Sequence, residues 1–527
     1  MARSFDVIIV GGGSAGCVLA ARLSEHPELR VCLIEAGGRD WHPFYKIPAG
    51  FAKMTKGIGA WGWSTVPQRH LGGRVLTFTQ ARVIGGGSSV NAQIYTRGHR
   101  QDFDEWRQLG CAGWGYEDVL PYFRKSEDND SLADPFHGQS GLLGVSRPAA
   151  PLPICEAYFK AAADLGIPFD ADLASAEPEG VGHYQLTQRG AQRSSTAQAF
   201  LWPAAHRSNL EVKLNAQVVR LTTDKGRVSG VQLGDETLTA SREVVLCSGA
   251  IGSPRLLMLS GIGPVDHLED VGIAPVFDAP EVGGNLQDHL DLFTIWACSG
   301  PHTYDAYASG LKSIWAGLRY MMRRDGPAAS SLFETGGFWY ADPAARSPDL
   351  QFHLGLGSGI EAGVAHMASG GVTLNSAYLR PRSRGTVRLA SSDPQAAPLI
   401  DPNYWSDPHD RDMSLRGLDL ARQIMAQTPL ASFVAQEVLP GPDVRDDAAC
   451  IAYAHTHAKT DHHPAGTCRM GADAGAVVDP RLRFQGMDGL RIADASIMPR
   501  LISSNTNATA IMIAEKAADM FRADHGL

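Results

Sequence analysis

Near its carboxyl end the chain concentrates side chains that could transfer protons or bind a metal: His455, His457, His462, His463 and Cys468. Imidazole and thiolate are good zinc or copper ligands. A neutral imidazole, with an unperturbed pKa of about 6.5, can instead accept a proton near neutral pH. If the residues up to His457 are helical, His455 and His457 diverge by about 200° around the axis. We therefore expect no metal site, and the residues alone leave a proton-transfer or a structural role open for His463.

The glycine-rich stretch at the amino end has the composition of a dinucleotide site. Val7 to Val10 predict a buried strand, and Gly11, Gly13 and Gly16 fit G-x-G-x-x-G at the start of a helix near Ala15. A second strand over 30–35 ends in Glu35, at the distance where a carboxylate meets ribose hydroxyls. This stretch alone predicts a dinucleotide and leaves NAD and FAD open.

Two further glycine-rich runs have the same character. Gly85-Gly-Gly-Ser-Ser-Val-Asn91 would let backbone pass close to a flat or anionic ligand, or could form an ordinary turn. Ser248 to Gly263 predicts a strand end, a glycine turn and a helix that Pro254 opens from its first turn. A glycine pair also occurs over 282–289.

The remaining pattern predicts the elements that position these segments. Helices are expected over 116–125, 154–165, 310–324, 410–427 and 508–521, and strands over 210–214, 216–221, 228–233, 243–247, 350–354 and 386–390. The strands between 210 and 247 suggest a β-meander added to the first sheet. A strand that ends in Asp494, followed by a helix whose start carries Asn505 and Asn507, predicts a return of the chain to that sheet.

Length and composition exclude several classes of protein. The 527 residues favour two domains, and the net charge of −9 argues against nucleic acid and anionic lipid as partners. No run is apolar enough for a membrane span, and the eight cysteines are scattered without paired spacing. We expect a cytoplasmic protein with reduced thiols. Peripheral membrane contact and the oligomeric state stay open.

Four separated segments together resemble the glucose-methanol-choline (GMC) family of FAD-dependent oxidoreductases. They are the opening turn with Glu35, the run that ends at Asn91, the run over 249–263, and His463-Pro-Ala-Gly-Thr-Cys-Arg-Met-Gly471 with the Asp494 and Asn505 segment behind it. The resemblance spans essentially the whole chain and is weakest over about 300–380.

The resemblance implies FAD, and it implies which residues would contact it. Some family members attach the flavin covalently to a histidine just before the second segment's asparagine; here that position is Val90, so non-covalent FAD is expected. The implied cofactor residues are Gly11, Gly13, Ser14, Ala15, Gly16, Glu35, Ala36, Arg82, Gly86, Ser89, Val90, Asn91, Ala92, Val218, Ser248, Gly249, Asp494, Ala495, Asn505, Thr506 and Asn507.

The resemblance also implies the chemistry. His463 would accept the hydroxyl proton of a primary alcohol, hydride would pass to the flavin, and an aldehyde would form. Asn505 would donate a hydrogen bond to the substrate oxygen, or serve only as a helix N-cap. Oxygen and a quinone are both open as acceptor, and a redox-silent lyase of the hydroxynitrile lyase kind is the alternative. If the alcohol were choline, Glu334 or Tyr304 could help to bind its cation.

The expected fold is α/β with an α+β second domain. A Rossmann-like FAD-binding domain, with a parallel sheet plus the meander, is expected over 1–154, 193–297 and 459–527. A substrate-binding cap with an antiparallel sheet is expected over 155–192 and 298–458.

Overall fold

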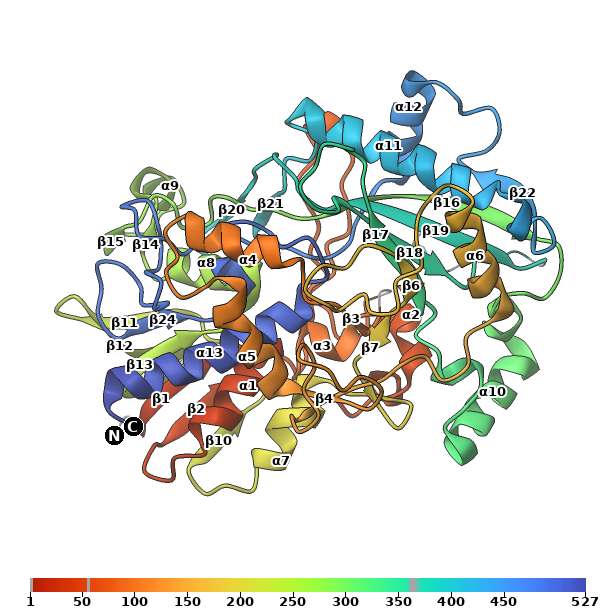
Figure 1. The fold of residues 1–527 in the computed structure, drawn as a ribbon. Helices are drawn as coiled ribbons and strands as arrows, with labels where there is room; N and C mark the ends of the chain where they lie inside the picture. The colour runs from red at the N-terminus through yellow and green to blue at the C-terminus, as the bar shows by residue number, and fades with distance from the viewer. Residues whose placement is uncertain (1–2, 55–56, 359, 361–366, 368) are drawn as a thin grey trace.

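The computed structural model describes residues 3–54, 57–358, 360, 367 and 369–527. Within this part of the chain two seven-stranded sheets dominate the fold (Figure 1). Both expected architectures are confirmed: the first sheet is largely parallel with an antiparallel meander, and the second is antiparallel.

The first sheet is built around the opening strand. Its order is β10 (Leu210–Lys213), β2 (Val31–Ile34), β1 (Arg3–Val10), β13 (Glu236–Leu246), β12 (Arg227–Leu233) and β11 (Arg220–Asp224), with β24 (Leu490–Ile492) paired to β13. β10, β2, β1, β13 and β24 run parallel, so their carboxyl ends share one edge. The glycine turn after β1 and Asp494 after β24 therefore meet there, although they are far apart in the sequence.

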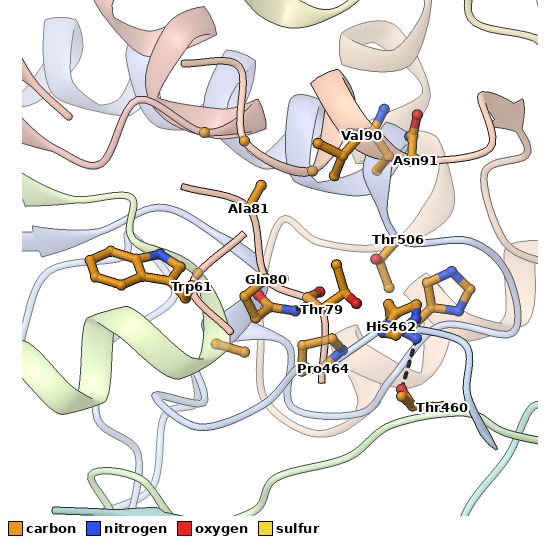
Figure 2. Close-up of a pocket in the computed structure, with 18 of the residues that line it drawn as sticks. Trp61, Thr79, Gln80, Ala81, Val90, Asn91, Thr460, His462, Pro464 and Thr506 are labelled. Atoms are coloured by element: carbon orange, nitrogen blue, oxygen red, sulfur yellow. Dashed lines mark hydrogen bonds between the residues drawn. The ribbon is translucent and has the colours of Figure 1, made fainter. Parts of the chain in front are cut away.

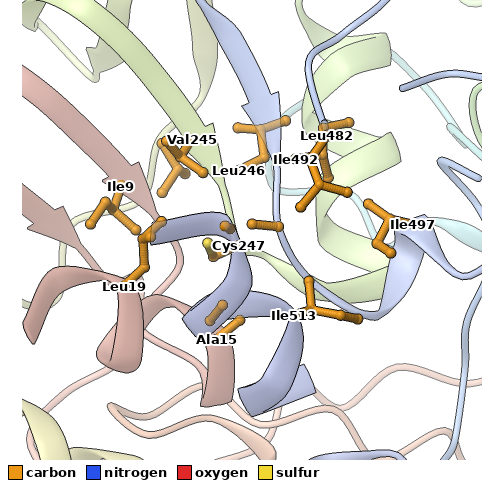
Figure 3. Close-up of a cluster of buried hydrophobic side chains, with 14 of the residues drawn as sticks. Ile9, Ala15, Leu19, Val245, Leu246, Cys247, Leu482, Ile492, Ile497 and Ile513 are labelled. Carbon is orange, nitrogen blue, oxygen red and sulfur yellow. The ribbon is translucent and has the colours of Figure 1, made fainter. Parts of the chain in front are cut away.

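Helices from both ends of the chain pack side by side against this sheet (Figure 1). α1 (Ser14–Leu23) contacts α13 (Asn507–His525), which also contacts α5 (Tyr116–Ser126). Arg22 forms a bidentate ion pair with buried Glu515 at 2.8–3.0 Å, and Ser14 Oγ donates to Asn507 Oδ1 at 2.8 Å. Figure 3 shows the apolar core between these layers, where Leu19 and Ile513 approach Ile9, Val245 and Ile492.

The second sheet carries the other wall of the site. Its order is β22 (Val434–Leu439), β16 (Leu290–Cys298), β19 (Gly371–Tyr378), β18 (Leu350–Gly355), β17 (Thr335–Trp339) and β6 (Gly180–His183), with β23 (Lys459–Thr460) paired to β16. β16 and β23 belong to this second sheet, although the ranges expected for the FAD-binding domain, 193–297 and 459–527, contain most of β16 and all of β23. The division into domains itself stays a prediction.

The remaining main helices are α4 (Arg100–Gln108), α6 (Pro153–Ala163), α8 (Gly249–Leu259), α9 (Val265–Asp270), α10 (Gly310–Arg323), α11 (Pro408–Met425) and α12 (Asp447–His457). Short helical turns include α2 (Phe51–Met54), α3 (Gly87–Val90) and α7 (Trp202–Ala204). Two-stranded ladders join β3 (Ile94–Tyr95) to β7 (Gln185–Leu186), β4 (Glu127–Asn129) to β5 (Leu143–Val145), β8 (Gln188–Arg189) to β9 (Gln192–Arg193), β14 (Ile262–Gly263) to β15 (Phe277–Asp278), and β20 (Thr386–Arg388) to β21 (Leu399–Asp401).

The strand expected over 216–221 begins only at Arg220. The backbone before it is drawn instead toward the segment that follows β2: Ala216 N–H donates to the Glu35 carbonyl at 2.9 Å, and Asn215 N–H to that of Gly37 at 2.8 Å. Residues 216–218 consequently form an irregular wall beside Glu35.

Pro254 does not lie in the first turn of α8, as the sequence suggested, but inside the helix, which begins at Gly249. A proline at this position cannot donate to the carbonyl of Ala250, four residues earlier. The Thr467 hydroxyl donates to that carbonyl instead, at 2.6 Å, and Thr467 is fully buried. The segment after His463 is thereby fixed to α8 by the bond that the proline leaves open.

This arrangement predicts a stability effect with an internal rescue. Thr467→Val should lower the free energy of unfolding by about 1–3 kcal/mol, because it leaves a buried carbonyl without a donor. In a Pro254→Ala background, residue 254 has an N–H that can donate to the Ala250 carbonyl. Thr467→Val should therefore lower the free energy of unfolding clearly less in this background. Denaturant unfolding of the four proteins measures this coupling; an equal cost in both backgrounds would contradict it.

Candidate active site

A chamber of about 1040 Å³ opens at the edge where the parallel strands end, and it reaches the second sheet. Ligand pockets usually measure roughly 300–1,000 Å³, so this one can hold a dinucleotide and leave space beside it. Figure 2 shows residues of separate segments gathered around the hollow, among them Trp61, Val90, Asn91, His462 and Thr506. The expected site residues that line it are Gly11, Gly13, Ser14, Ala15, Glu35, Ala36, Gly86, Val90, Asn91, Ala92, Val218, Ser248, Gly249, His463, Asp494, Ala495, Asn505, Thr506 and Asn507.

Three expected cofactor residues lie elsewhere. Gly16 packs against the turn, where a Cβ would lie 1.9 Å from the Gly11 carbonyl oxygen, so its task is close packing of helix on strand. Ser89 is fully buried and donates to the Ile84 carbonyl at 2.8 Å. Arg82 places its guanidinium over the Trp61 ring, 4.6 Å from the centroid. These residues support the chamber wall rather than face the chamber.

Glu35 marks one end of the chamber. Its carboxylate accepts the N–H groups of Gly12 at 2.8 Å and Gly37 at 2.7 Å. Burial raises the pKa of Glu35 to about 7, against the opposing effect of these bonds. Each carboxylate oxygen of Glu35 can still accept a further hydrogen bond. A pair of ribose hydroxyls could donate these bonds.

The glycine turns at Gly13 and Gly86 bring backbone atoms that carry no side chain close together in the chamber wall. A Cβ on Gly86 would lie 2.6 Å from the Gly13 Cα, so the second turn needs glycine at residue 86 to approach the first. The α1 and α13 amino ends, tied by Ser14 and Asn507, open at the same place. Unpaired N–H groups of helix amino ends favour anionic groups. Asp494 accepts from Gly249 N–H at 2.9 Å and Ser253 Oγ at 2.6 Å, which holds a third glycine turn here.

His463 lies at the opposite end of the chamber, and its hydrogen bonds determine its tautomer. His289 Nε2 is 3.1 Å from the Leu379 carbonyl oxygen, which can only accept, so this nitrogen carries the proton of a neutral His289. The bare Nδ1 of His289 therefore accepts from His463 Nδ1–H at 3.0 Å. It follows that Nε2 of a neutral His463 is bare.

Asn505 faces this bare nitrogen. Its Oδ1 accepts from Gln351 Nε2 at 2.9 Å and from the Thr96 hydroxyl at 3.1 Å, which turns Nδ2 toward His463 Nε2 at 3.2 Å. The alternative role as helix cap is not supported, because Thr506 is the N-cap of α13 and no side chain caps it. Asn505 is thus an amide donor held beside the bare nitrogen of His463.

Burial keeps the His463 ring neutral. It lowers the pKa of His463 to about 4 against the opposing attraction of Asp461, and that of His289 to about 3. Burial alone would raise the pKa of Asp461, but Lys459 and the surrounding histidines hold it below its usual range. A carboxylate next to His463 can therefore stabilise an imidazolium as it forms.

Asp288 fixes the loop that carries His463. Its carboxylate accepts His463 N–H at 2.8 Å, Thr460 Oγ at 2.5 Å and the Tyr404 hydroxyl. Asp288 and His289 belong to the glycine-pair run noted in the sequence, but nothing there signalled their contact with a histidine 174 positions later. Gln351 and Thr96 carried no sequence signal.

In the described part of the chain, the potential ligand atoms of His455, His457, His462, His463 and Cys468 do not converge on one point. Cys468 is buried, and burial raises its thiol pKa well above the ordinary value, while His457 stacks on Tyr453. Potential ligand atoms converge instead at Asp134, His137 and Asp172. There His137 already bonds Glu127 and Asp172, at 2.8 and 3.0 Å, and Arg97 pairs with Glu127.

The whole chain is similar to known proteins of one family. The family model described as GMC oxidoreductase matches residues 5–291 and 381–514 in its N- and C-terminal parts. An alcohol dehydrogenase [acceptor] of Pseudomonas putida is 40% identical over 98% of this chain and 95% of its own, and human mitochondrial choline dehydrogenase is 39% identical over 99% and 90%. Among solved structures, pyridoxine 4-oxidase from Mesorbium loti is similar with TM-score 0.90, 34% identity and 99% coverage of both chains.

The buried histidines predict how stability changes with pH. Burial lowers the pKa of His353 to about 4 in the folded protein, while an unfolded histidine titrates near ~6.5. Below that pH the unfolded state binds more protons, so stability falls as the pH decreases toward 4. Between about pH 6 and about pH 5, the free energy of unfolding of the His353→Gln variant should fall by about 1 kcal/mol less than that of the parent. Urea unfolding at the two pH values measures this difference.

The matched control is His206→Gln, which alters an exposed histidine outside the chamber and should leave the parent slope unchanged. An unchanged slope in the His353 variant would contradict the burial argument.

Proposed function

The chain belongs to the GMC oxidoreductase family, and on this premise we propose that it oxidises a primary alcohol to an aldehyde with His463 as the base. It is an FAD-dependent oxidoreductase of the kind that acts on CH–OH groups. The observation that carries the proposal is the bare Nε2 of His463, held beside the Asn505 amide inside the chamber.

The residues present fit FAD. Glu35 would bind the adenosine ribose, and the glycine turns with the α1 amino end would accommodate the pyrophosphate. Asp494 and Ala495 would lie along the ribityl chain, and Val90, Asn91 and the α13 amino end along the flavin. Val90 has no nucleophile, which supports non-covalent binding.

The chain's own residues perform the proton chemistry. The substrate hydroxyl would donate to His463 Nε2, while Asn505 Nδ2 would donate to the same oxygen and polarise it. FAD, when bound, would supply the acceptor for the hydride that leaves the carbinol carbon. As Nε2 gains the proton, His289 continues to accept Nδ1–H and Asp461 attracts the positive charge. The ring therefore keeps its orientation throughout the transfer.

Aromatic side chains beside His463 suit an alcohol with an aliphatic or aromatic body. Phe51, Phe293, Phe333 and His353 line the chamber together with His463. Glu334 and Tyr304, the residues considered for a choline cation, do not belong to its lining, and burial raises the pKa of Glu334 to about 7. Both features argue against a cation site formed by this pair.

Oxygen and a quinone-type compound both stay open as the electron acceptor. One relative is called an oxygen-dependent choline dehydrogenase, and another an alcohol dehydrogenase [acceptor], a name that does not specify the acceptor. These relatives are dehydrogenases and oxidases, which gives the redox-silent lyase alternative no support. In the described part of the chain no helix has both the length and the hydrophobicity to cross a membrane. A cytoplasmic location stays a prediction, and the oligomeric state stays open.

Anaerobic flavin bleaching by a panel of primary alcohols tests the proposal. The parent protein should be bleached by at least one alcohol, and His463→Ala should slow that step by roughly 10² or more, because it loses a positioned base. His462→Ala is the matched control: this neighbour lines the chamber but makes none of the hydrogen bonds that hold Asn505. Near-normal bleaching by the His463 variant, or bleaching by no alcohol, would refute the assignment.

A further inference from the structure

Helix α10 presents the most concentrated exposed apolar surface of the described chain. Figure 1 shows it at the margin of the molecule, away from the first sheet. Six of the fourteen large apolar side chains that are exposed belong to this one helix: Leu311, Ile314, Trp315, Leu318, Met321 and Met322. Leu311 is 85% exposed and Met322 76%. Single exposed apolar residues need no explanation, but a patch of this kind marks an interaction site.

The spacing puts these side chains on one stripe. At about 100° per residue, the six positions fall within an arc of about 120°. The buried residues of the helix, Ala316 and Tyr320, lie on the opposite side and hold it to the protein, where the Tyr320 hydroxyl donates to the Ala191 carbonyl at 2.9 Å. The apolar stripe therefore points directly outward.

Basic side chains flank the stripe. Lys312, Arg319 and Arg323 fall together within about 40° on one side of it, and Arg324 follows at the C-cap. Residues 310–324 contain no acidic side chain, although the whole chain carries −9. Asp325, 2.6 Å from Arg319 Nε, is the acidic partner next along the chain.

We propose that α10 is a docking surface for the anionic face of a phospholipid bilayer. An outward apolar stripe with Trp315, flanked by cations, is the pattern of helices that lie in the membrane interface. The helix spans about 21 Å, so it would lie in the plane of the surface and insert its side chains only into the headgroup boundary. A two-fold contact with a second copy would bring the basic groups of both helices together, which disfavours that occupant.

Co-flotation with vesicles tests the proposal. The FAD-loaded protein should float with vesicles of equal parts phosphatidylcholine and phosphatidylglycerol, bind phosphatidylcholine alone much more weakly, and dissociate as salt is raised. Leu311→Gln with Met322→Gln should lower the partition coefficient at least about tenfold. Lys312→Gln with Arg323→Gln should lower it about fivefold per charge.

Two matched controls remove comparable groups elsewhere on the surface. Trp41→Gln with Val276→Gln deletes exposed apolar side chains, and Arg220→Gln with Lys225→Gln deletes exposed charges. Both should bind vesicles like the parent, and all variants should keep the parent's bleaching rate.

Failure to float with anionic vesicles, equal binding to both vesicle types, or unchanged binding of the α10 variants would overturn the proposal. Sedimentation without lipid distinguishes the other occupant: a dimer that the Leu311 and Met322 changes dissociate would assign this face to a second copy. The flotation and sedimentation results do not depend on whether the protein oxidises alcohols.

Discussion

A backbone carbonyl can only accept a hydrogen bond, and the chemistry of the chamber depends on one such group, that of Leu379. It orients the proton of His289, which in turn orients that of His463 and leaves Nε2 bare. Burial adds the second constraint, because it keeps both rings neutral. The proposed base is therefore prepared before a substrate arrives, and little reorganisation is needed when the proton moves.

The strand pairing of the second sheet brings the three residues of this relay together. Leu379 directly follows β19, and His289 directly precedes β16, the strand hydrogen-bonded to β19. His463 follows β23, which pairs with the start of β16. The second sheet thus supplies the relay, while the first sheet supplies Glu35 and the glycine turns at the other end of the chamber. The hydrogen bond from Thr467 to the Ala250 carbonyl fixes the segment that follows His463 to helix α8.

Much of the site could be predicted because its signals are local. A glycine turn between a strand and a helix has a fixed spacing, and Glu35 follows from the same unit. His463 and Asn505 were recognised by their surrounding motifs, and both line the chamber. The His289–His463 contact could not be predicted, since these residues lie next to two different strands, β16 and β23, whose pairing cannot be read from the sequence. Likewise, Pro254 suggested a helix start. Thr467, the donor that replaces the missing N–H of Pro254, lies 217 positions from the Ala250 carbonyl, so the local sequence does not reveal it.

The ¹⁵N chemical shifts of the histidine rings test the central claim most directly, since they report which ring nitrogen carries the proton. The spectrum of His-labelled protein can be assigned at His463 by comparison with a His463→Gln variant. The account predicts a neutral ring with Nδ1 protonated and Nε2 bare, which persists well below the ordinary histidine pKa of ~6.5. A ring protonated at Nε2, or one that titrates near that ordinary value, would contradict it.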